Sequence, residues 1–294
     1  MTMDDFISKL KYNFKQGNIL SKLIYINVGL FLIIRLFALI CTLFSIDGGG
    51  LLLFLQVPSS PELLLYRPWT LITYMFTHFD FLHILFNMLW LYWFGGLFLT
   101  FFSERQLGGL YLIGGIAGAL LYIVSYNLFP YFSEAAAYST LMGASASVMA
   151  IVFAVSFYKK DMEISLFIIG RIKLIYLALF TFVVDLLAIT SDNAGGHIAH
   201  IGGALVGIVY ALQIAKGKDL TVPLNRIIDF FVNISRRKPK MKVTHRRTEN
   251  DRDYNARKQS EQVVIDAILD KLKRSGYESL SESEKKQLFD ASKK

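Results

Sequence analysis

The stretch GASASVMA, from Gly143 to Ala150, places two serines and a glycine in an apolar segment that has no charged side chain between Glu134 and Lys159. A serine in hydrocarbon usually packs between helices or hydrogen-bonds to a neighbouring helix. It can also act as a nucleophile when a base lies beside it. The role of these serines therefore depends on which other polar side chains the fold brings to them.

The whole chain is too apolar for an ordinary soluble domain. Of its 294 residues, 54% are hydrophobic and 18% are charged, and the mean hydropathy is +0.44. This composition predicts a membrane protein with several spans. The single cysteine, Cys41, excludes an internal disulfide and a cysteine-rich metal site.

Long apolar segments recur along the chain, and a helix needs about 20 such residues to cross a bilayer. The run from Leu23 to Phe44 is longer than the core of a signal peptide, so we expect it to be retained as a span. The fold is predicted to be all-α, a six-helix transmembrane bundle. Its predicted spans are 21–45, 82–102, 107–128, 144–158, 173–190 and 197–215.

Lysine and arginine gather beside the two ends of the chain's apolar part and in the connections after the second and fourth spans. The opposite connections offer only Arg67. Because basic residues favour the cytoplasmic side, both termini are predicted to be cytoplasmic, in a multi-pass protein of a bacterial inner membrane. The glycine- and proline-broken segment 47–81 is expected to form an outer loop half-submerged in the interface.

The sequence divides into four predicted parts. A basic cluster at 236–247 holds seven Lys and Arg, and it is typical either of a solvated linker or of a site for anionic lipid. Near the C-terminus, Gly276 is a helix stop, and Ser281 with Glu284 forms a capping-box pattern. The parts are a cytosolic segment 1–20, a transmembrane domain 21–215, an amphipathic and basic linker 216–259, and a small cytosolic helical hairpin 260–294.

Polar side chains cluster at the start of the second span, in the stretch THFDFLHILFN. His83 and Asn87 are four residues apart and share one helix face, and His78 precedes them. Polar groups at membrane depth are energetically costly, so each of these side chains is a candidate for function.

The last span contains a second cluster, in GGHIAHIGGALVG. His197 and His200 are three residues apart and share a face, while Gly203 and Gly207 allow close packing against a neighbouring helix. If that neighbour is segment 144–158, His200 can reach Ser145.

A metal centre is not the expected use of these histidines. The helical zinc motif HExxH is absent, and Asp80 is the one carboxylate beside the first cluster. We therefore predict no metal and no cofactor.

A nucleophilic serine accounts for more of the pattern. Histidine is the usual base for a serine hydroxyl, and acyl transfer also needs donors that face the developing oxyanion. Asn87 and His83 can supply such donors, as can the free N–H of Ser145 in the first turn of a helix. Gly143 allows a tight backbone entry into that helix. Taken singly, however, a serine such as Ser145 is more often a packing residue or an interhelical hydrogen-bond partner, and Asn87 is equally consistent with a hydrogen bond between helices.

In these three motifs the chain resembles the rhomboid family of intramembrane serine proteases, over about residues 20–215. The resemblance implies a dyad of Ser145 and His200 without an acidic third member. It also implies an oxyanion hole from Asn87, His83 and the Ser145 N–H. The motifs are His78-x4-His83-x3-Asn87, Gly143-x-Ser145 and His200-Ile-Gly-Gly-x3-Gly207.

The resemblance assigns supporting roles to other residues. His78 would be structural in the outer loop, and Gly143 would belong to the active-site backbone. The chain departs from the family pattern at His197, an extra histidine one turn before His200 and a candidate supporting partner for it. Asp185 is expected to lie near the outer end of its span and to reach water rather than to complete a triad. Arg35 is expected to face protein or to extend to the interface.

The implied reaction is hydrolysis of peptide bonds in or near transmembrane segments of membrane proteins. The expected partners are such substrates and the lipid bilayer, and no nucleic acid. Two alternatives remain: a catalytically inactive rhomboid-like scaffold, and a transporter that uses the polar residues as a pathway.

Overall fold

The computed structural model describes residues 12, 14–166, 170–235 and 251–292. The chain forms two compact units, Met1–Arg236 and Arg237–Lys294. The predicted N-terminal segment lies largely outside the described residues, and so does the basic cluster at 236–247. The expectation of anionic lipid at that cluster therefore stays a prediction.

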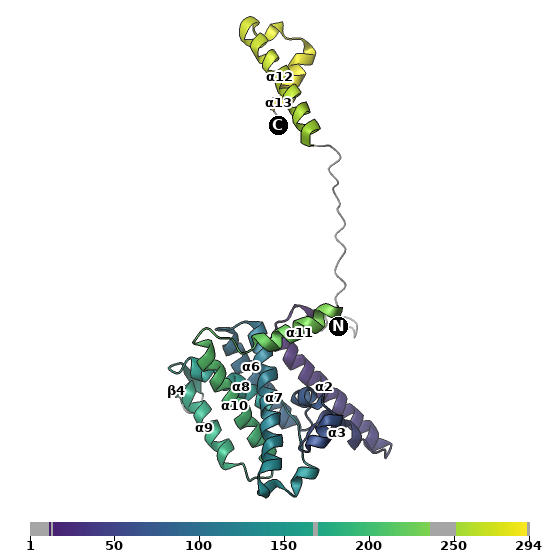
Figure 1. Cartoon of the computed structure of the whole chain (residues 1–294), viewed down its shortest axis with the longest axis vertical. Coiled ribbons are helices and arrows are strands. Elements are labelled where there is room, and N and C mark those ends of the chain that lie inside the picture. The colour runs from purple at the N-terminus through teal and green to yellow at the C-terminus, as the bar shows by residue number, and fades with distance from the viewer. Residues whose placement is uncertain (1–11, 13, 167–169, 236–250, 293–294) are drawn as a thin grey trace. The chain divides into compact units, whose positions relative to one another are not determined.

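The first unit is mostly helical, and each predicted span coincides with one helix (Figure 1). Among the described residues, α2, α6, α7 and α10 are long and apolar enough to cross a membrane. The other two, α8 and α9, have 14 residues each, so the structure has four candidate spans and two shorter apolar helices. The bounds are α2 Ile19–Leu43, α6 Phe81–Leu99, α7 Glu104–Leu128, α8 Ser145–Tyr158, α9 Leu174–Leu187 and α10 Ala194–Ile214.

Helix α8 lies at the centre of the unit and is buried from Ala146 to Ser156. Glycines of α10 allow close packing against it. A Cβ added at Gly203 would lie 2.0 Å from the carbonyl oxygen of Ala146, and one added at Gly207 would lie 2.3 Å from that of Ala150. The predicted close packing of this span against a neighbouring helix is therefore confirmed, and the neighbour is α8, the helix that begins at Ser145.

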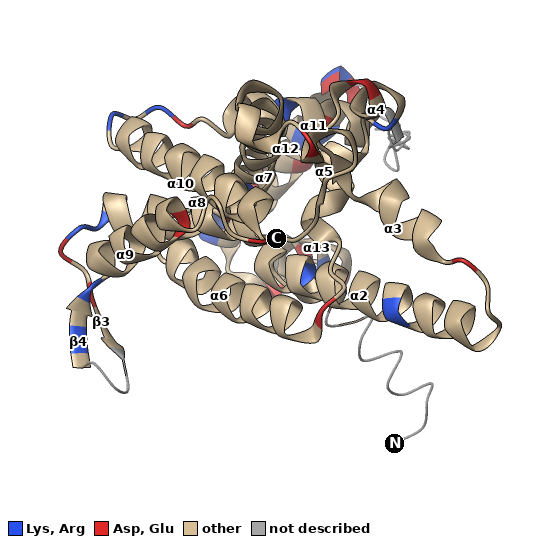
Figure 2. Ribbon diagram, turned by 90° about the horizontal axis from the view of Figure 1, so that it is seen from below, with Lys and Arg blue, Asp and Glu red and all other residues tan. Residues whose placement is uncertain are grey.

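The surfaces of these helices suit an apolar surrounding. Helix α6 carries no Lys, Arg, Asp or Glu along its length (Figure 2). The guanidinium of Arg35, on α2, lies 4.6 Å from the centre of the Phe79 ring, a cation–π contact with the protein.

The segment between α2 and α6 is a series of short elements rather than a plain loop. Its strand β1 pairs antiparallel with β2, Thr140–Leu141, which leads directly into the turn before Ser145. The elements are α3 Gly49–Leu55, β1 Val57–Pro58, α4 Pro61–Tyr66, α5 Thr70–Thr73 and the 3-10 helix η1 Tyr74–Phe76. Two further 3-10 helices, η2 Pro130–Phe132 and η3 Ala135–Ala137, precede β2.

Between α8 and α9 this mostly helical unit contains a second short pair of strands. Strands β3, Glu163–Leu166, and β4, Gly170–Lys173, form an antiparallel pair. Beside this pair the ammonium of Lys173 donates to the Asp161 carboxylate at 2.8 Å. Strand β4 is exposed at Gly170 and Arg171 and partly buried at Ile172 and Lys173.

Helix α11, Val222–Ser235, follows α10 and packs against α7. Arg105 at the start of α7 forms an ion pair with Asp229, and its carbonyl accepts from the Asn225 amide at 3.2 Å. These contacts tie the first part of the predicted linker to the helical unit.

The second unit consists of α12 Asp251–Ser275, the 3-10 helix η4 Tyr277–Ser279 and α13 Glu282–Ser292. Gly276 ends α12 with a φ of 76°. The Ser281 N–H donates to the Glu284 carboxylate at 2.7 Å, and the Glu284 N–H donates to the Ser281 hydroxyl at 3.4 Å, so the capping box is present. Helix α12 begins earlier than the boundary at 260 that the sequence indicated.

Candidate active site

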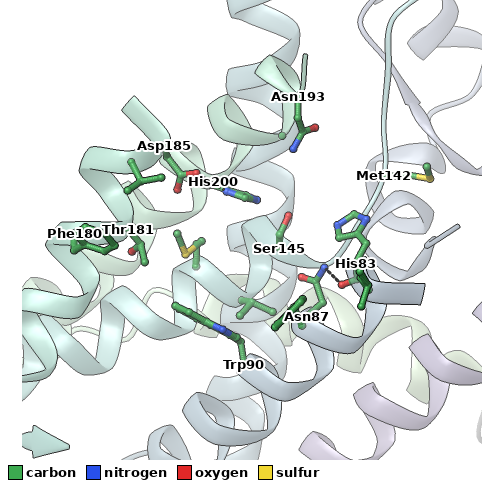
Figure 3. A pocket seen from close by; sticks show the side chains of 16 residues that line it. His83, Asn87, Trp90, Met142, Ser145, Phe180, Thr181, Asp185, Asn193 and His200 are labelled. Carbon is green, nitrogen blue, oxygen red and sulfur yellow. Dashed lines mark hydrogen bonds and ion pairs between the residues drawn. The ribbon is translucent and has the colours of Figure 1, made fainter. Parts of the chain in front are cut away.

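A pocket of about 450 Å³ opens between α6, α8, α9 and α10. It contains His83 and Asn87 of the first polar cluster and His200 of the second, together with one acidic residue from α9 (Figure 3). The polar and ionisable side chains of the lining are His83, Asn87, Ser145, Thr181, Asp185, Asn193 and His200.

Ser145 is the first residue of α8, so its backbone N–H has no partner within the helix. The turn before it depends on Gly143, whose φ of +122° is rarely adopted by residues with a side chain. A Cβ there would also lie 2.8 Å from the His83 ring. The Gly143 N–H donates to the Tyr74 carbonyl at 2.9 Å, which holds this turn beside η1.

His78 lies behind the turn and is fully buried. Its Nε2 accepts a hydrogen bond from the Ala144 N–H at 3.3 Å. Burial lowers the pKa of His78 to about 3, so the ring is neutral near neutral pH and can serve as this acceptor. His78 does not line the pocket, and its contacts support the backbone that presents Ser145.

His83 and Asn87 both face the pocket from α6, as their spacing predicted. The Asn87 amide nitrogen donates to the His83 carbonyl at 2.9 Å, a bond along the same helix (Figure 3). An amide nitrogen carries two hydrogens, so this contact leaves Asn87 one further donor.

His200 reaches the pocket from α10. Its hydrogen-bond partner is Asp185, whereas the sequence predicted Ser145. A carboxylate oxygen of Asp185 lies 2.8 Å from Nδ1 of His200 and also 2.8 Å from Nδ1 of His197. The Asp185 side chain is only 7% exposed. The expectation that Asp185 reaches water was therefore wrong, because α9 turns this residue toward α10 rather than outward.

The same three side chains form a group that could hold a metal ion. The ligand atoms of Asp185, His197 and His200 lie within 4.8 Å of one another. The sequence argument against a metal considered Asp80 and overlooked this carboxylate. The two hydrogen bonds use Nδ1 of each histidine and one oxygen of the Asp185 carboxylate.

Ser145 and His200 line one pocket, and in the view of Figure 3 the His200 ring lies between Asp185 and Ser145. No hydrogen bond joins the Ser145 hydroxyl to His200 within the described residues. Such bonds are often long before a substrate binds. A hydroxyl, an imidazole and several N–H donors around one cavity are the groups that acyl transfer at a carbonyl requires.

The other serines of the opening stretch and its approach are used in packing. The Ser147 hydroxyl is buried and faces the Met75 sulfur at 3.7 Å. The Ser139 hydroxyl accepts from the Tyr122 hydroxyl at 2.8 Å. Ser145 differs from both because it lines the pocket.

Known families match two parts of this chain. The Rhomboid domain family matches residues 66–217. A family of unknown function (DUF6576) matches residues 249–294.

Curated relatives share the first of these parts. The chain is 30% identical over 161 residues to RHOMBOID-like protein 12, mitochondrial, of Arabidopsis thaliana, covering 52% of this chain and 48% of that protein. It is also 30% identical over 148 residues to the presenilin-associated rhomboid-like protein, mitochondrial, of Homo sapiens and of Mus musculus, covering 46% of this chain and 35% of each. The matches therefore span less than half of each relative. Since these relatives are mitochondrial, they give no support to the predicted bacterial inner membrane.

Proposed function

The chain belongs to the rhomboid family, and its described residues include four helices long and apolar enough to cross a membrane. We propose that it is an intramembrane serine endopeptidase. The shorter helices α8 and α9 complete a six-helix bundle in this proposal. Both termini are assigned to the same side of the membrane, opposite the outer loop 47–81. The substrates are transmembrane segments of other membrane proteins.

Four residues of the pocket have proposed roles in the reaction. Ser145 attacks the scissile carbonyl, and His200 takes its proton and later returns it to the leaving amine. Asn87, His83 and the Ser145 N–H stabilise the oxyanion. Lipid offers no water, so the pocket must open to the aqueous side, and the substrate helix must unwind locally to expose its carbonyl.

The observation that carries this proposal is the composition of the pocket. A half-buried serine at a helix start, a histidine and two further N–H donors come from three different helices to one cavity of about 450 Å³. Packing alone does not require these polar groups to line a common open space in an otherwise apolar bundle.

The inactive scaffold is the second candidate, favoured by the absence of a hydrogen bond between Ser145 and His200 among the described residues. Labelling with a fluorophosphonate distinguishes the two, because the probe reacts with an activated serine and needs no knowledge of the natural substrate. We expect the full chain in detergent to be labelled at Ser145, as mapped by mass spectrometry of the peptide.

Two matched variants complete this test. Ser145→Ala should abolish labelling, whereas Ser147→Ala, on the same helix but buried outside the pocket, should retain it. Absence of labelling in folded wild-type protein would favour the scaffold.

A further inference from the structure

Asp185 of α9, which hydrogen-bonds to His197 and His200 of α10, has no role in the mechanism proposed so far. Asp185 lies in the last turn of α9, where the negative end of the helix dipole disfavours a carboxylate. It is nearly buried in a helix that has no other charged residue. In the part of the chain that the structure describes, its ion-pair partners are the two histidines, with no Lys or Arg. Such a placement is energetically costly, so the carboxylate is a candidate for function.

The hydrogen bonds indicate what that function is. A carboxylate accepts hydrogen bonds and does not donate them, so the ring nitrogen that faces it must carry the proton. The contact at 2.8 Å joins Asp185 to Nδ1 of His200. When Nδ1 carries the proton of a neutral imidazole, Nε2 has the free lone pair, and Nε2 is the nitrogen that can accept a proton from Ser145.

Resting on the proposed protease function, we propose that Asp185 is a positioning residue that holds His200 in the orientation and tautomer needed for proton transfer. The site is then a Ser145–His200–Asp185 triad, which departs from the dyad that the family resemblance implied. Asp185 does not touch the substrate and acts through His200.

His197 has a secondary part in the same arrangement. Its Nδ1 lies 2.8 Å from the same carboxylate oxygen, and it does not line the pocket. Two donors on one oxygen fix the carboxylate between successive turns of α10. His197 therefore orients Asp185 and has no direct path to the substrate.

Kinetics of the full chain in detergent on a cleavable transmembrane substrate tests this role. Asp185→Asn keeps the size of the side chain and removes the charge, and its amide can donate to Nδ1 and so favour the wrong tautomer. We expect kcat to fall by about 100-fold or more with little change in KM, since a correctly placed general base contributes about 10²–10⁴-fold. His197→Ala should be milder, because the bond from Asp185 to His200 remains.

Asp192→Asn is the matched control, because Asp192 is an exposed carboxylate in the connection between α9 and α10. It should leave kcat unchanged. A wild-type kcat in folded Asp185→Asn would overturn the proposal, and so would a loss in His197→Ala greater than that in Asp185→Asn.

A spectroscopic measurement keeps the proposal testable even if Asp185→Asn does not fold. The ¹⁵N chemical shifts of histidine-labelled wild type report which ring nitrogen carries the proton, with His200→Gln to assign the signals. We expect protonated Nδ1 and unprotonated Nε2 at His200, and the reverse would overturn the inference. An inactive wild type with this tautomer contradicts the protease function alone, whereas an active wild type with the reverse tautomer contradicts the role of Asp185 alone.

Discussion

Substitution of Gly203 by alanine tests the packing that brings the proposed nucleophile and base together. The added Cβ would lie 2.0 Å from the carbonyl oxygen of Ala146, the residue after Ser145. Ordinary van der Waals contact begins at 3.4 Å, so the two backbones must separate by about 1.4 Å along this direction. Gly203 lies one turn after His200, and the separation therefore moves the base away from the serine.

The expected effect is large for one methyl group. Overpacking of this kind destabilises by about 1–3 kcal/mol. A misplacement of about 1 Å can lower a catalytic rate by about 10²-fold. We therefore expect Gly203→Ala to lower Tm in detergent and to reduce kcat/KM by about 100-fold or more, with a matching loss in the rate of fluorophosphonate labelling.

The control is Gly96→Ala in α6, where an added Cβ meets no heavy atom within 4 Å. Both substitutions gain the same helix propensity, about 1 kcal/mol, so this term cancels in the comparison. Gly96→Ala should retain activity and have an equal or higher Tm. Wild-type activity and Tm in Gly203→Ala would refute the close packing of α8 and α10 as the feature that aligns the site.

Three further outcomes are expected. Asn87→Ala should lower kcat by about 10²-fold at most with KM nearly unchanged, because other oxyanion donors remain; an unchanged kcat with a lowered Tm would assign Asn87 to structure. Gly143→Ala should abolish labelling of Ser145, since its φ of +122° and the His83 ring at 2.8 Å exclude a Cβ, and labelling at the wild-type rate would contradict this geometry. Deletion of residues 237–294, the whole second unit, should leave cleavage of a test substrate in detergent intact, and loss of activity in a folded truncation would make that unit part of the enzyme.

Local patterns in the sequence predicted what depends on local geometry. The spacing of His83 and Asn87, and of His197 and His200, placed each pair on one helix face, as the structure has them. The pair Gly203 and Gly207 indicated a close helix contact, which the structure shows between α10 and α8.

The arrangement of α9 against α10 was not predicted. The sequence cannot say which face of α9 turns toward α10, so the two hydrogen bonds of Asp185 were missed. The signal available was the acidic residue itself, alone in an apolar helix. The hydrogen bond from Asn87 to the His83 carbonyl was missed for a different reason. An asparagine side chain in a helix can hydrogen-bond either to the backbone of its own helix or to groups in the cavity, and the sequence does not say which. The short length of α8 was predicted by the span 144–158, whereas α9 ends at Leu187, before the predicted end of its span at 190.

The central claim is that Ser145 cleaves peptide bonds in transmembrane segments, and one measurement tests it most directly. Purified wild type and Ser145→Ala are incubated in detergent with a single-span test substrate, and the products are identified by mass spectrometry. We predict a defined cut in or near the substrate's transmembrane segment by wild type and none by Ser145→Ala with an unchanged Tm. Equal cleavage by the folded variant would contradict the claim.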